Sequence, residues 1–261
     1  MAHRFILFEV DHGVARITLN RPDVLNSIHT AMSGEIQDVL AQAAREREIR
    51  AVLLTGKGRG FCAGQDLDEV RPGAAVDDFA AHARKVYTPL VRGLRTLEKP
   101  VICAVNGVAA GAGANLALAC DLVLAAEEAS FVQAFAKIGL VLDTGGSFLL
   151  PRLVGLARAT ALAMLAEKIT AAQAVEMGLI YRAYPAASLD DEASKLALHL
   201  ATQPTLGLGL TKRLLNASLV NDLEAQLELE AECQGAAGRS ADYAEGVAAF
   251  LAKRKPVFTG Q

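Results

Sequence analysis

Residues 101–126 read VICAVNGVAAGAGANLALACDLVLAA and contain no Lys, Arg or Glu. A stretch of this length and composition either spans a membrane or lies in the core of a soluble domain. Asn106, Asn115 and Asp121 interrupt the apolar run, glycines cluster in its middle, and β-branched residues mark its ends. This pattern favours a strand, a loop, a helix and a second strand over one continuous helix. We therefore expect a buried segment of a folded domain and no membrane span.

Strand-like and helix-like segments alternate along most of the chain. Residues 4–10 and 14–20 predict a hairpin joined at DHG, and residues 50–56 predict a buried strand. Between them, residues 30–49 predict a helix capped by Thr30, because apolar side chains recur there at helical spacing. The alternation predicts an α/β fold whose active groups lie on connecting loops.

The C-terminal quarter has a different, purely helical pattern. Apolar stripes at helical spacing run through residues 188–203, 205–219 and 222–238. We therefore expect two parts, a core of residues 1–187 and a C-terminal helical region of residues 188–261. Residues 71–85 show no clear periodicity, and we expect a loop there.

Charge and cysteine content exclude several classes of function. The chain has 26 Lys and Arg against 29 Asp and Glu, so its formal net charge of −3 gives no footprint for nucleic acid or an anionic membrane. The four cysteines form no CxxC pair and have no His at ligand spacing, which predicts reduced thiols and no structural metal. The first apolar run is too short for a secretory leader, so we expect a cytoplasmic protein.

Two glycine-bearing loops follow strand-like segments, at residues 53–67 and 105–118. The first has no GK[ST], and the second has Leu116 where a dinucleotide fingerprint needs its third glycine, so both nucleotide interpretations are weak. Where side chains are absent, backbone N–H groups become accessible and can bind a developing oxyanion. The alternative is that the glycines only permit tight turns and close packing.

Asp143 stands in the stretch KIGLVLDTGGSFLLP, residues 137–151, which holds no other carboxylate. An acid among apolar neighbours loses hydration, which raises its pKa and makes it a stronger base. Such a base can remove a proton next to a carbonyl when donors hold the enolate oxygen. The alternative is that Asp143 caps a helix beginning near Gly146 or bonds to the glycine backbone. The local sequence leaves both interpretations open.

The segments LNRPDVLNS, LLTGKGRGFCAGQDL, KPVICAVNGVAAGAGANLALACDLVLAAEEASF and KIGLVLDTGGSFLLPRLVG resemble, in order and spacing, the enoyl-CoA hydratase/isomerase (crotonase) superfamily. The resemblance covers nearly the whole chain. It implies a crotonase-like spiral of ββα units with a C-terminal helical region used in trimerisation, often as a dimer of trimers. It also implies an acyl-CoA substrate and no cofactor, because CoA is part of the substrate.

The resemblance implies a set of site residues. The thioester oxygen would be bound by the backbone N–H groups of Gln65 and Ala112, and Asp143 would be the catalytic acid–base group. The remaining positions implied to contact the substrate are Arg21, Val24, Ala63, Asp66, Leu67, Gly111, Asn115 and Phe135.

Departures from the family pattern carry further information. Hydratases of the family use two glutamates, and Asn115 and Phe135 stand at those positions here, so hydration is not expected. Asp143 stands where isomerase branches and the dehalogenases place their catalytic aspartate, as a proton shuttle or, more rarely, as a nucleophile.

The segments GRGFCAGQDL, HLATQPTLGLGL and AGRSADYAEGVAAFLAKRKPVFTG are similar to the branch that acts on ring-epoxidised phenylacetyl-CoA in phenylacetate catabolism. This similarity implies an isomerase that forms oxepin-CoA. Two alternatives remain: an enoyl-CoA or dienoyl-CoA isomerase of fatty-acid oxidation, and a catalytically silent scaffold with the same fold.

Overall fold

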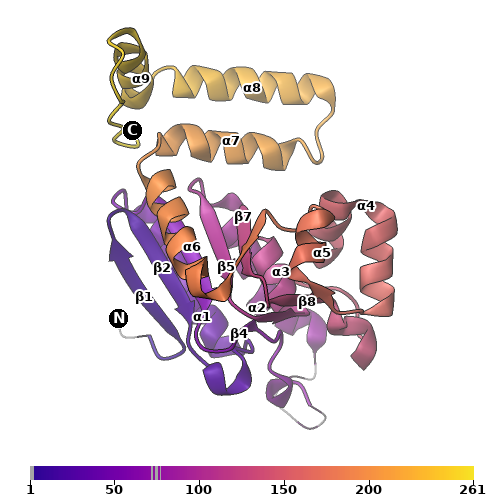
Figure 1. The fold of residues 1–261 in the computed structure, drawn as a ribbon. Helices are drawn as coiled ribbons and strands as arrows, with labels where there is room; N and C mark the ends of the chain where they lie inside the picture. Colours follow the sequence, from indigo (N-terminus) through magenta and orange to yellow (C-terminus); the bar gives the residue numbers. More distant parts are fainter. Residues whose placement is uncertain (1–2, 72, 74–75, 77) are drawn as a thin grey trace.

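Two neighbouring sheets form the centre of the protein (Figure 1). The computed structural model describes residues 3–71, 73, 76 and 78–261. The larger sheet has the order β1 (Ile6–Asp11), β2 (Val14–Leu19), β3 (Ala51–Gly56), β5 (Val101–Val105), β7 (Leu122–Ala126) and β10 (Arg182–Tyr184). The β1–β2 pair is the antiparallel hairpin that the sequence predicts, and the other neighbours pair in parallel. Strands β3 and β5 are buried along their whole length, as parallel strands covered on both faces require.

The smaller sheet has the order β4 (Gly60–Cys62), β6 (Val108–Ala110), β8 (Ser130–Val132) and β9 (Ile169–Thr170). Strands β4, β6 and β8 pair in parallel, and β9 is antiparallel to β8. In three successive steps the chain passes from a strand of the larger sheet to one of the smaller and then into a helix. This repeat is the expected spiral of ββα units, and its loops meet beside the smaller sheet.

Helices cover the sheets and connect the repeats. The bounds are α1 (Thr30–Arg45), α2 (Phe79–Thr96), α3 (Ala112–Leu118), α4 (Gly146–Leu165), α5 (Ala171–Glu176) and α6 (Ala186–Ala201), with 3₁₀ turns η1 (Pro22–Val24), η2 (Leu67–Glu69) and η3 (Ala134–Ile138). Helix α1 packs on α2, and α6 packs on β3 and β5.

The N-terminal ends of α1 and α2 differ from the sequence predictions. The cap of α1 is His29, whose Nδ1 accepts from Met32 N–H at 3.0 Å, so the prediction of Thr30 was wrong by one residue. The predicted loop at residues 71–85 includes the start of α2, and its residues 72, 74–75 and 77 lie outside the described residues.

Within the described residues, α4 is the one helix long and apolar enough to cross a membrane by length and composition. Pro151 lies in its interior, and Gly155 interrupts it with φ 77° and ψ 160°. A residue in this conformation ends the regular hydrogen-bond ladder, so α4 is two short segments joined at a kink. Neither segment has the roughly 20 residues that span a bilayer.

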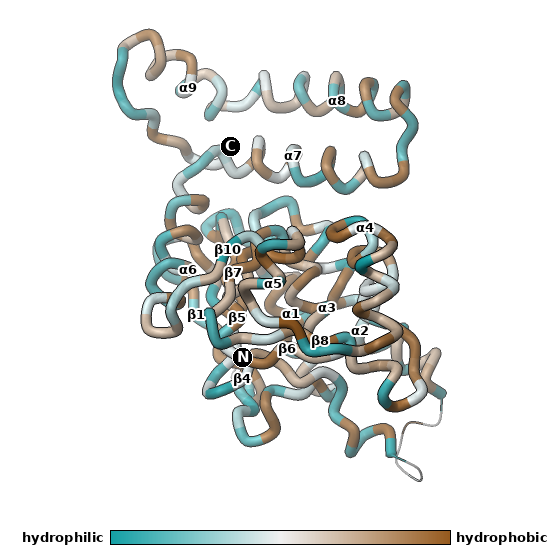
Figure 2. The backbone as a smooth tube through the Cα atoms, turned by 45° about the vertical axis from the view of Figure 1, so that its right-hand side comes forward, coloured by the Kyte–Doolittle hydropathy of each residue, from teal (hydrophilic) through white to brown (hydrophobic). Residues whose placement is uncertain are grey.

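Helices α7 (Thr205–Ala217), α8 (Leu223–Ala237) and α9 (Ala241–Leu251) form a layer beyond the sheets. Figure 1 shows α7 and α8 side by side above the rest of the molecule, with α9 at their end, while α6 lies against the sheet. Hydrophobic and hydrophilic residues alternate along α7 and α8 (Figure 2). These helices confirm the prediction of a helical C-terminal region. The boundary at residue 188 stays a prediction.

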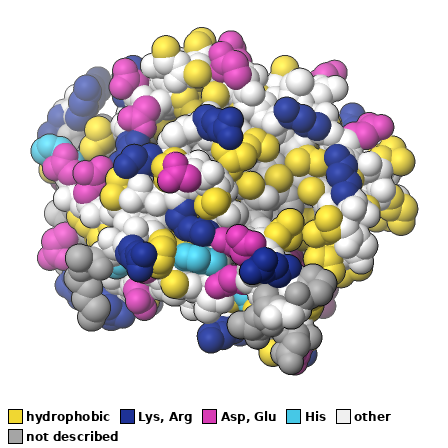
Figure 3. All heavy atoms as spheres, turned by 90° about the horizontal axis from the view of Figure 1, so that it is seen from below, with side chains coloured by type: hydrophobic (Ala, Val, Ile, Leu, Met, Phe, Trp, Pro, Cys, Tyr) yellow, Lys and Arg dark blue, Asp and Glu magenta, His cyan; other side chains and the backbone are white. Residues whose placement is uncertain are grey.

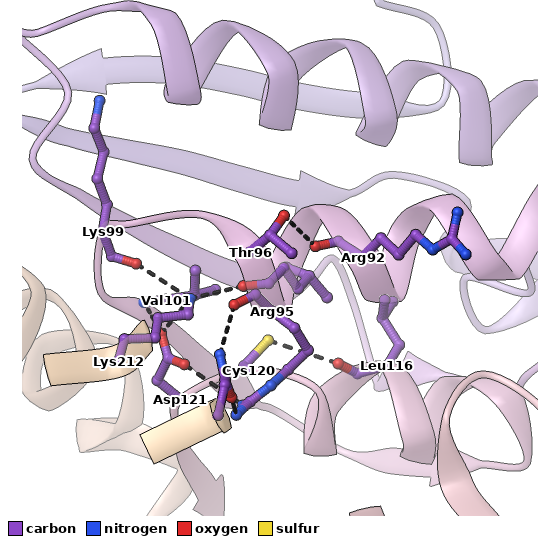
Figure 4. A network of polar contacts seen from close by, with 11 residues as sticks. Arg92, Arg95, Thr96, Lys99, Val101, Leu116, Cys120, Asp121 and Lys212 are labelled. Carbon is purple, nitrogen blue, oxygen red and sulfur yellow. Dashed lines mark hydrogen bonds and ion pairs between the residues drawn. The ribbon is translucent and has the colours of Figure 1, made fainter. Parts of the chain in front are cut away.

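A buried polar network joins α7 to the core (Figure 4). Lys212 Nζ lies 2.8 Å from Asp121 Oδ2 and donates to the carbonyl of Leu94 at 2.7 Å. Asp121 Oδ2 also accepts from Val101 N–H at 2.8 Å, and Arg95 approaches its other oxygen at 3.6 Å. Burial lowers the pKa of Lys212, and the charge of Asp121 opposes that shift. The network is therefore the main ionic link between the helical layer and the start of β5.

We predict that Lys212→Ala costs about 3–5 kcal/mol in the free energy of unfolding, because it leaves Asp121 half-buried without its closest cation. Denaturant titration measures this loss. The matched control is Lys195→Ala, which removes an exposed pair with Glu192 and should change stability by less than about 1 kcal/mol. Equal effects of the two substitutions would contradict the assignment of Lys212 as a buried link.

Candidate active site

Two backbone loops meet where β4 and β6 end side by side. Gly64 has φ 98°, and a Cβ built on it would lie 2.7 Å from the Ala110 oxygen and 3.5 Å from the Ala112 nitrogen. Only glycine fits a contact this close. The amide groups of Gln65, the next residue, and of Ala112 are therefore brought to neighbouring positions on the two loops.

The N–H groups of Gln65 and Ala112 lack backbone acceptors in the described part of the chain, as donors of an oxyanion site need. Ala112 opens α3, where the first N–H groups have no partner within the helix. The loop at Gln65 is fixed on both sides, since Ile28 N–H donates to Gly64 at 2.7 Å and Asp66 N–H donates to Ile28 at 2.9 Å. Two fixed donors of this kind can bind an oxygen that gains charge during a reaction.

Asp143 lies on the loop between η3 and α4, half-buried. Burial raises the pKa of its carboxyl above the ordinary value, while a hydrogen bond from Thr144 and one from its own backbone amide oppose the rise. Thr144 Oγ1 donates to Asp143 Oδ1 at 2.7 Å. The α4 cap is Gly145 with no side-chain bond, and Gly146 N–H donates to the Asp143 backbone carbonyl at 2.8 Å. The carboxylate is therefore not the helix cap, which leaves it available as a base.

The two positions implied to hold glutamates in hydratases are both buried. Asn115 Nδ2 donates to the Asp143 carbonyl at 2.9 Å, and Asn115 Oδ1 accepts from Gln133 Nε2 at 2.9 Å. The Phe135 ring packs near Gly111, where an added Cβ would meet ring carbons at 3.7 Å. Asn115 thus ties the Asp143 loop to α3, and the Phe135 ring lies next to Gly111, directly before α3.

The segments implied to contact CoA also come together. Ala63 N–H donates to the Leu25 carbonyl at 2.9 Å, and Arg21 lies 2.8 Å from Asp66. Val24 is 45% exposed and Leu67 is 56% exposed, so both can contact a ligand at the surface.

Basic and acidic side chains are interspersed on the face shown in Figure 3. This face therefore carries no extended patch of one charge.

Sequence reasoning missed Thr144, Gln133 and Tyr87 near this site. The Tyr87 hydroxyl on α2 is buried and has no hydrogen-bond partner in the described part of the chain. Burial raises its pKa, and the negative charge of Asp143 raises it further, so the phenol stays protonated. Nothing in the sequence distinguishes Tyr87 from other core positions of its helix.

Cys62 lies beside the site but is inert. It is fully buried, and burial raises the pKa of its thiol to about 12. A protonated, inaccessible thiol is not a nucleophile. In the described residues, no three His, Cys, Asp or Glu side chains cluster as a metal site would require.

Comparison with known proteins gives the family. Residues 9–261 match the family described as Enoyl-CoA hydratase/isomerase. The chain is similar to the 1,2-epoxyphenylacetyl-CoA isomerase of Escherichia coli (strain K12), with 54% identity covering 98% of this chain and 99% of the relative. It is 48% identical to a "Probable enoyl-CoA hydratase" of Rhodobacter capsulatus, covering 100% of both chains. A crystal structure of enoyl-CoA hydratase from Bacillus anthracis matches with a TM-score of 0.94 and 33% identity, covering 99% of this chain and 100% of that one.

The fold and the family match define an enzyme of the crotonase-fold class, which acts on acyl-CoA thioesters. The chain belongs to the enoyl-CoA hydratase/isomerase family. Relatives named as isomerases and as hydratases are both similar to it, so the choice between these reactions depends on the site.

We predict that Asp143→Asn is more stable than the wild-type protein, by a margin that grows with pH. Because the folded-state pKa of Asp143 is raised, its contribution to stability is complete below the unfolded value of ~3.9 and is lost as pH rises through the folded value. Asparagine does not ionise, so the variant does not lose this stability as pH rises.

Thermal unfolding of the two proteins between pH 4 and pH 8 measures the margin. The exposed substitution Asp191→Asn on α6 serves as control and should show no such trend. A margin that is constant or shrinks with pH would show that ionised Asp143 costs the fold nothing.

Proposed function

We propose that this enzyme is an acyl-CoA isomerase of phenylacetate catabolism that converts ring-1,2-epoxyphenylacetyl-CoA to oxepin-CoA. The observation that carries the proposal is the half-buried Asp143, whose backbone carbonyl is tied through Asn115 to the helix that begins with Ala112. A base and an oxyanion donor are thereby fixed relative to each other. The similarity to the Escherichia coli isomerase supports the choice of acyl group.

The first step removes a proton next to the thioester. The Asp143 carboxylate takes the Cα proton, and the electron pair of the C–H bond moves toward the thioester carbonyl. The resulting enolate oxygen accepts hydrogen bonds from the N–H groups of Gln65 and Ala112. Donors of this kind are worth about 3–4 kcal/mol each in an enclosed site.

The second step returns the proton at a different carbon. The ring carbon–carbon bond that the epoxide oxygen bridges breaks, which opens the six-membered ring to the seven-membered oxepin. The enolate electrons form a double bond between Cα and the adjacent ring carbon, and the carboxylic acid of Asp143 returns its proton to the ring carbon γ to the thioester carbonyl. No atom is gained or lost, and nothing is oxidised or reduced overall. We therefore propose that the enzyme needs no cofactor and that CoA serves as the substrate handle.

The environment of Asp143 suits a base that is also an acid. Burial raises its pKa, so its carboxylate is a stronger base than an exposed one and returns the proton readily. Hydratases of the family hold glutamates at two positions where this chain has Asn115 and Phe135. The Asn115 amide is engaged in hydrogen bonds, and Phe135 is a buried aromatic ring. Neither can activate water, which favours isomerisation over hydration.

The test is conversion of ring-1,2-epoxyphenylacetyl-CoA, generated in situ and followed by chromatography and mass spectrometry. The wild-type enzyme and Asp191→Asn should form oxepin-CoA, and Asp143→Asn should be slower by about 10²–10⁴-fold, the contribution of a general base. Turnover of aliphatic β,γ-enoyl-CoA in preference to the epoxide would move the function to a fatty-acid isomerase. Tight acyl-CoA binding without turnover of any ester would identify a silent scaffold.

We also propose that the protein is a homotrimer or a dimer of trimers located in the cytoplasm. Large apolar side chains of the helical layer are exposed in the single chain, including Phe250 at 83%, Leu251 at 76% and Leu223 at 69%. Apolar exposure on this scale suits a surface covered by other copies of the chain.

Sedimentation equilibrium tests the assembly directly. Phe250→Asp should shift the mass toward the monomer because it places a charge in an apolar interface, while Asp191→Asn should leave the mass unchanged. A monomeric wild-type protein at micromolar concentration would refute the trimer.

A further inference from the structure

Thr144 has a backbone conformation that its side chain disfavours. Its φ is 49°, in the left-handed region that β-branched residues rarely adopt, and the residue is 4% exposed. Gly145, the next residue, also has a positive φ of 74°. Strain of this kind persists only where the surroundings enforce it, and it is concentrated at functional sites.

The strained conformation places the Thr144 hydroxyl on the carboxylate of Asp143. Oγ1 donates to Oδ1 at 2.7 Å, a length typical of a hydrogen bond to a charged oxygen. Among the described residues, the other carboxylate oxygen, Oδ2, accepts no side-chain or inter-residue backbone hydrogen bond. One oxygen is therefore held and the other is left for the substrate.

The backbone of Asp143 is held independently of its carboxylate. Asn115, which is fully buried, donates through Nδ2 to the Asp143 carbonyl at 2.9 Å. Its own orientation is set by Gln133, which donates to Oδ1 at 2.9 Å. The Asn115 N–H donates to the Gly111 carbonyl at 3.1 Å, directly before the oxyanion donor Ala112.

We infer that Thr144 and Asn115 are positioning residues that fix Asp143 at two points, Asn115 through its carbonyl and Thr144 through Oδ1, so that Oδ2 is the oxygen that takes the proton. This inference rests on the proposed role of Asp143 as the base. Asn115 sets the distance between the base and the oxyanion donors, and Thr144 sets the rotation of the carboxylate. Neither side chain needs to touch the reacting atoms.

The Thr144 hydroxyl also acts on the charge of Asp143. It stabilises the ionised form and so lowers the pKa that burial raises. The titratable group coupled to Asp143 from α2 is Tyr87, and its raised pKa keeps it neutral. Cys62 on β4, which acts on Tyr87, is also kept neutral by burial. The pKa of His82, which packs edge-on against Tyr87, is lowered below 6.5 by burial. Removing the hydroxyl should therefore raise the pKa of Asp143 alone.

The test measures proton removal without requiring the full reaction. Phenylacetyl-CoA is incubated in D₂O with the enzyme between pH 5 and pH 9, and deuterium at Cα is followed by mass spectrometry. In each exchange, Asp143 takes a proton from Cα, the C–H electron pair forms the enolate, and a deuteron from the re-equilibrated carboxylic acid returns to the same carbon. No other reactant is needed.

Three substitutions at one position separate the hydroxyl from the backbone. Thr144→Val keeps the shape and removes the donor, Thr144→Gly removes both the donor and the strain, and Thr144→Ser keeps the donor. We expect Thr144→Val and Thr144→Gly to exchange about tenfold more slowly at pH 7, the loss of one charge-assisted hydrogen bond, with their pH midpoint moved to higher pH. Thr144→Ser should retain the wild-type midpoint.

Asn115→Ala gives a second, independent measurement. It should lower the kcat of exchange about tenfold with KM for phenylacetyl-CoA nearly unchanged, because it disturbs the position of the base and not CoA binding.

Three outcomes would overturn the inference. Exchange by Thr144→Gly at the wild-type rate with an unchanged midpoint would show that the hydroxyl does nothing. An unchanged kcat in Asn115→Ala would show that Asn115 does not position the base. If the wild-type enzyme shows no Asp143-dependent exchange at all, the proposed base itself fails, and the positioning role fails with it.

Discussion

The close approach of α3 to the loops around it is the constraint on which the site depends. Gly64 permits the loop that carries Gln65 to lie against the start of α3, and Gly146 permits Asn115 to reach the Asp143 carbonyl, because a Cβ at either glycine would overlap the opposing atoms. A larger side chain at Gly64 would push apart the proposed oxyanion donors Gln65 and Ala112, and one at Gly146 would displace the proposed base, Asp143. The spiral of ββα units makes this contact possible, because β4 and β6 pair in parallel and end side by side in the smaller sheet. The loops that follow them therefore meet.

Much of the fold could be predicted because its segments have a period. The hairpin, the buried strand at residues 51–56 and the C-terminal helices follow from apolar spacing alone. The smaller sheet could not be predicted, because strands of two or three residues show no alternation. The cap of α1 was misplaced because His29 accepts through a ring nitrogen, a role that residue statistics assign to Ser, Thr, Asp or Asn. The break at Gly155 lies within an apolar run and gives no signal of its own.

Only those parts of the candidate site that depend on the type of a single residue could be predicted from the sequence. A lone carboxylate among apolar neighbours made Asp143 a candidate base, and family resemblance supplied Gln65 and Ala112 as candidate oxyanion donors, whose backbone groups no residue type reveals. These roles stay predictions. The contacts that organise the site could not be predicted, since Thr144, Asn115 and Gln133 are brought together only by the tertiary fold. These polar residues look like ordinary loop and helix positions in the sequence.

The most direct test of the account is a crystal structure of Asp143→Asn with phenylacetyl-CoA bound. We expect the thioester oxygen to lie about 3 Å from the backbone nitrogens of both Gln65 and Ala112, with Cα facing the side chain of residue 143. A thioester bound away from these two N–H groups, or a Cα directed away from residue 143, would contradict the account at its centre.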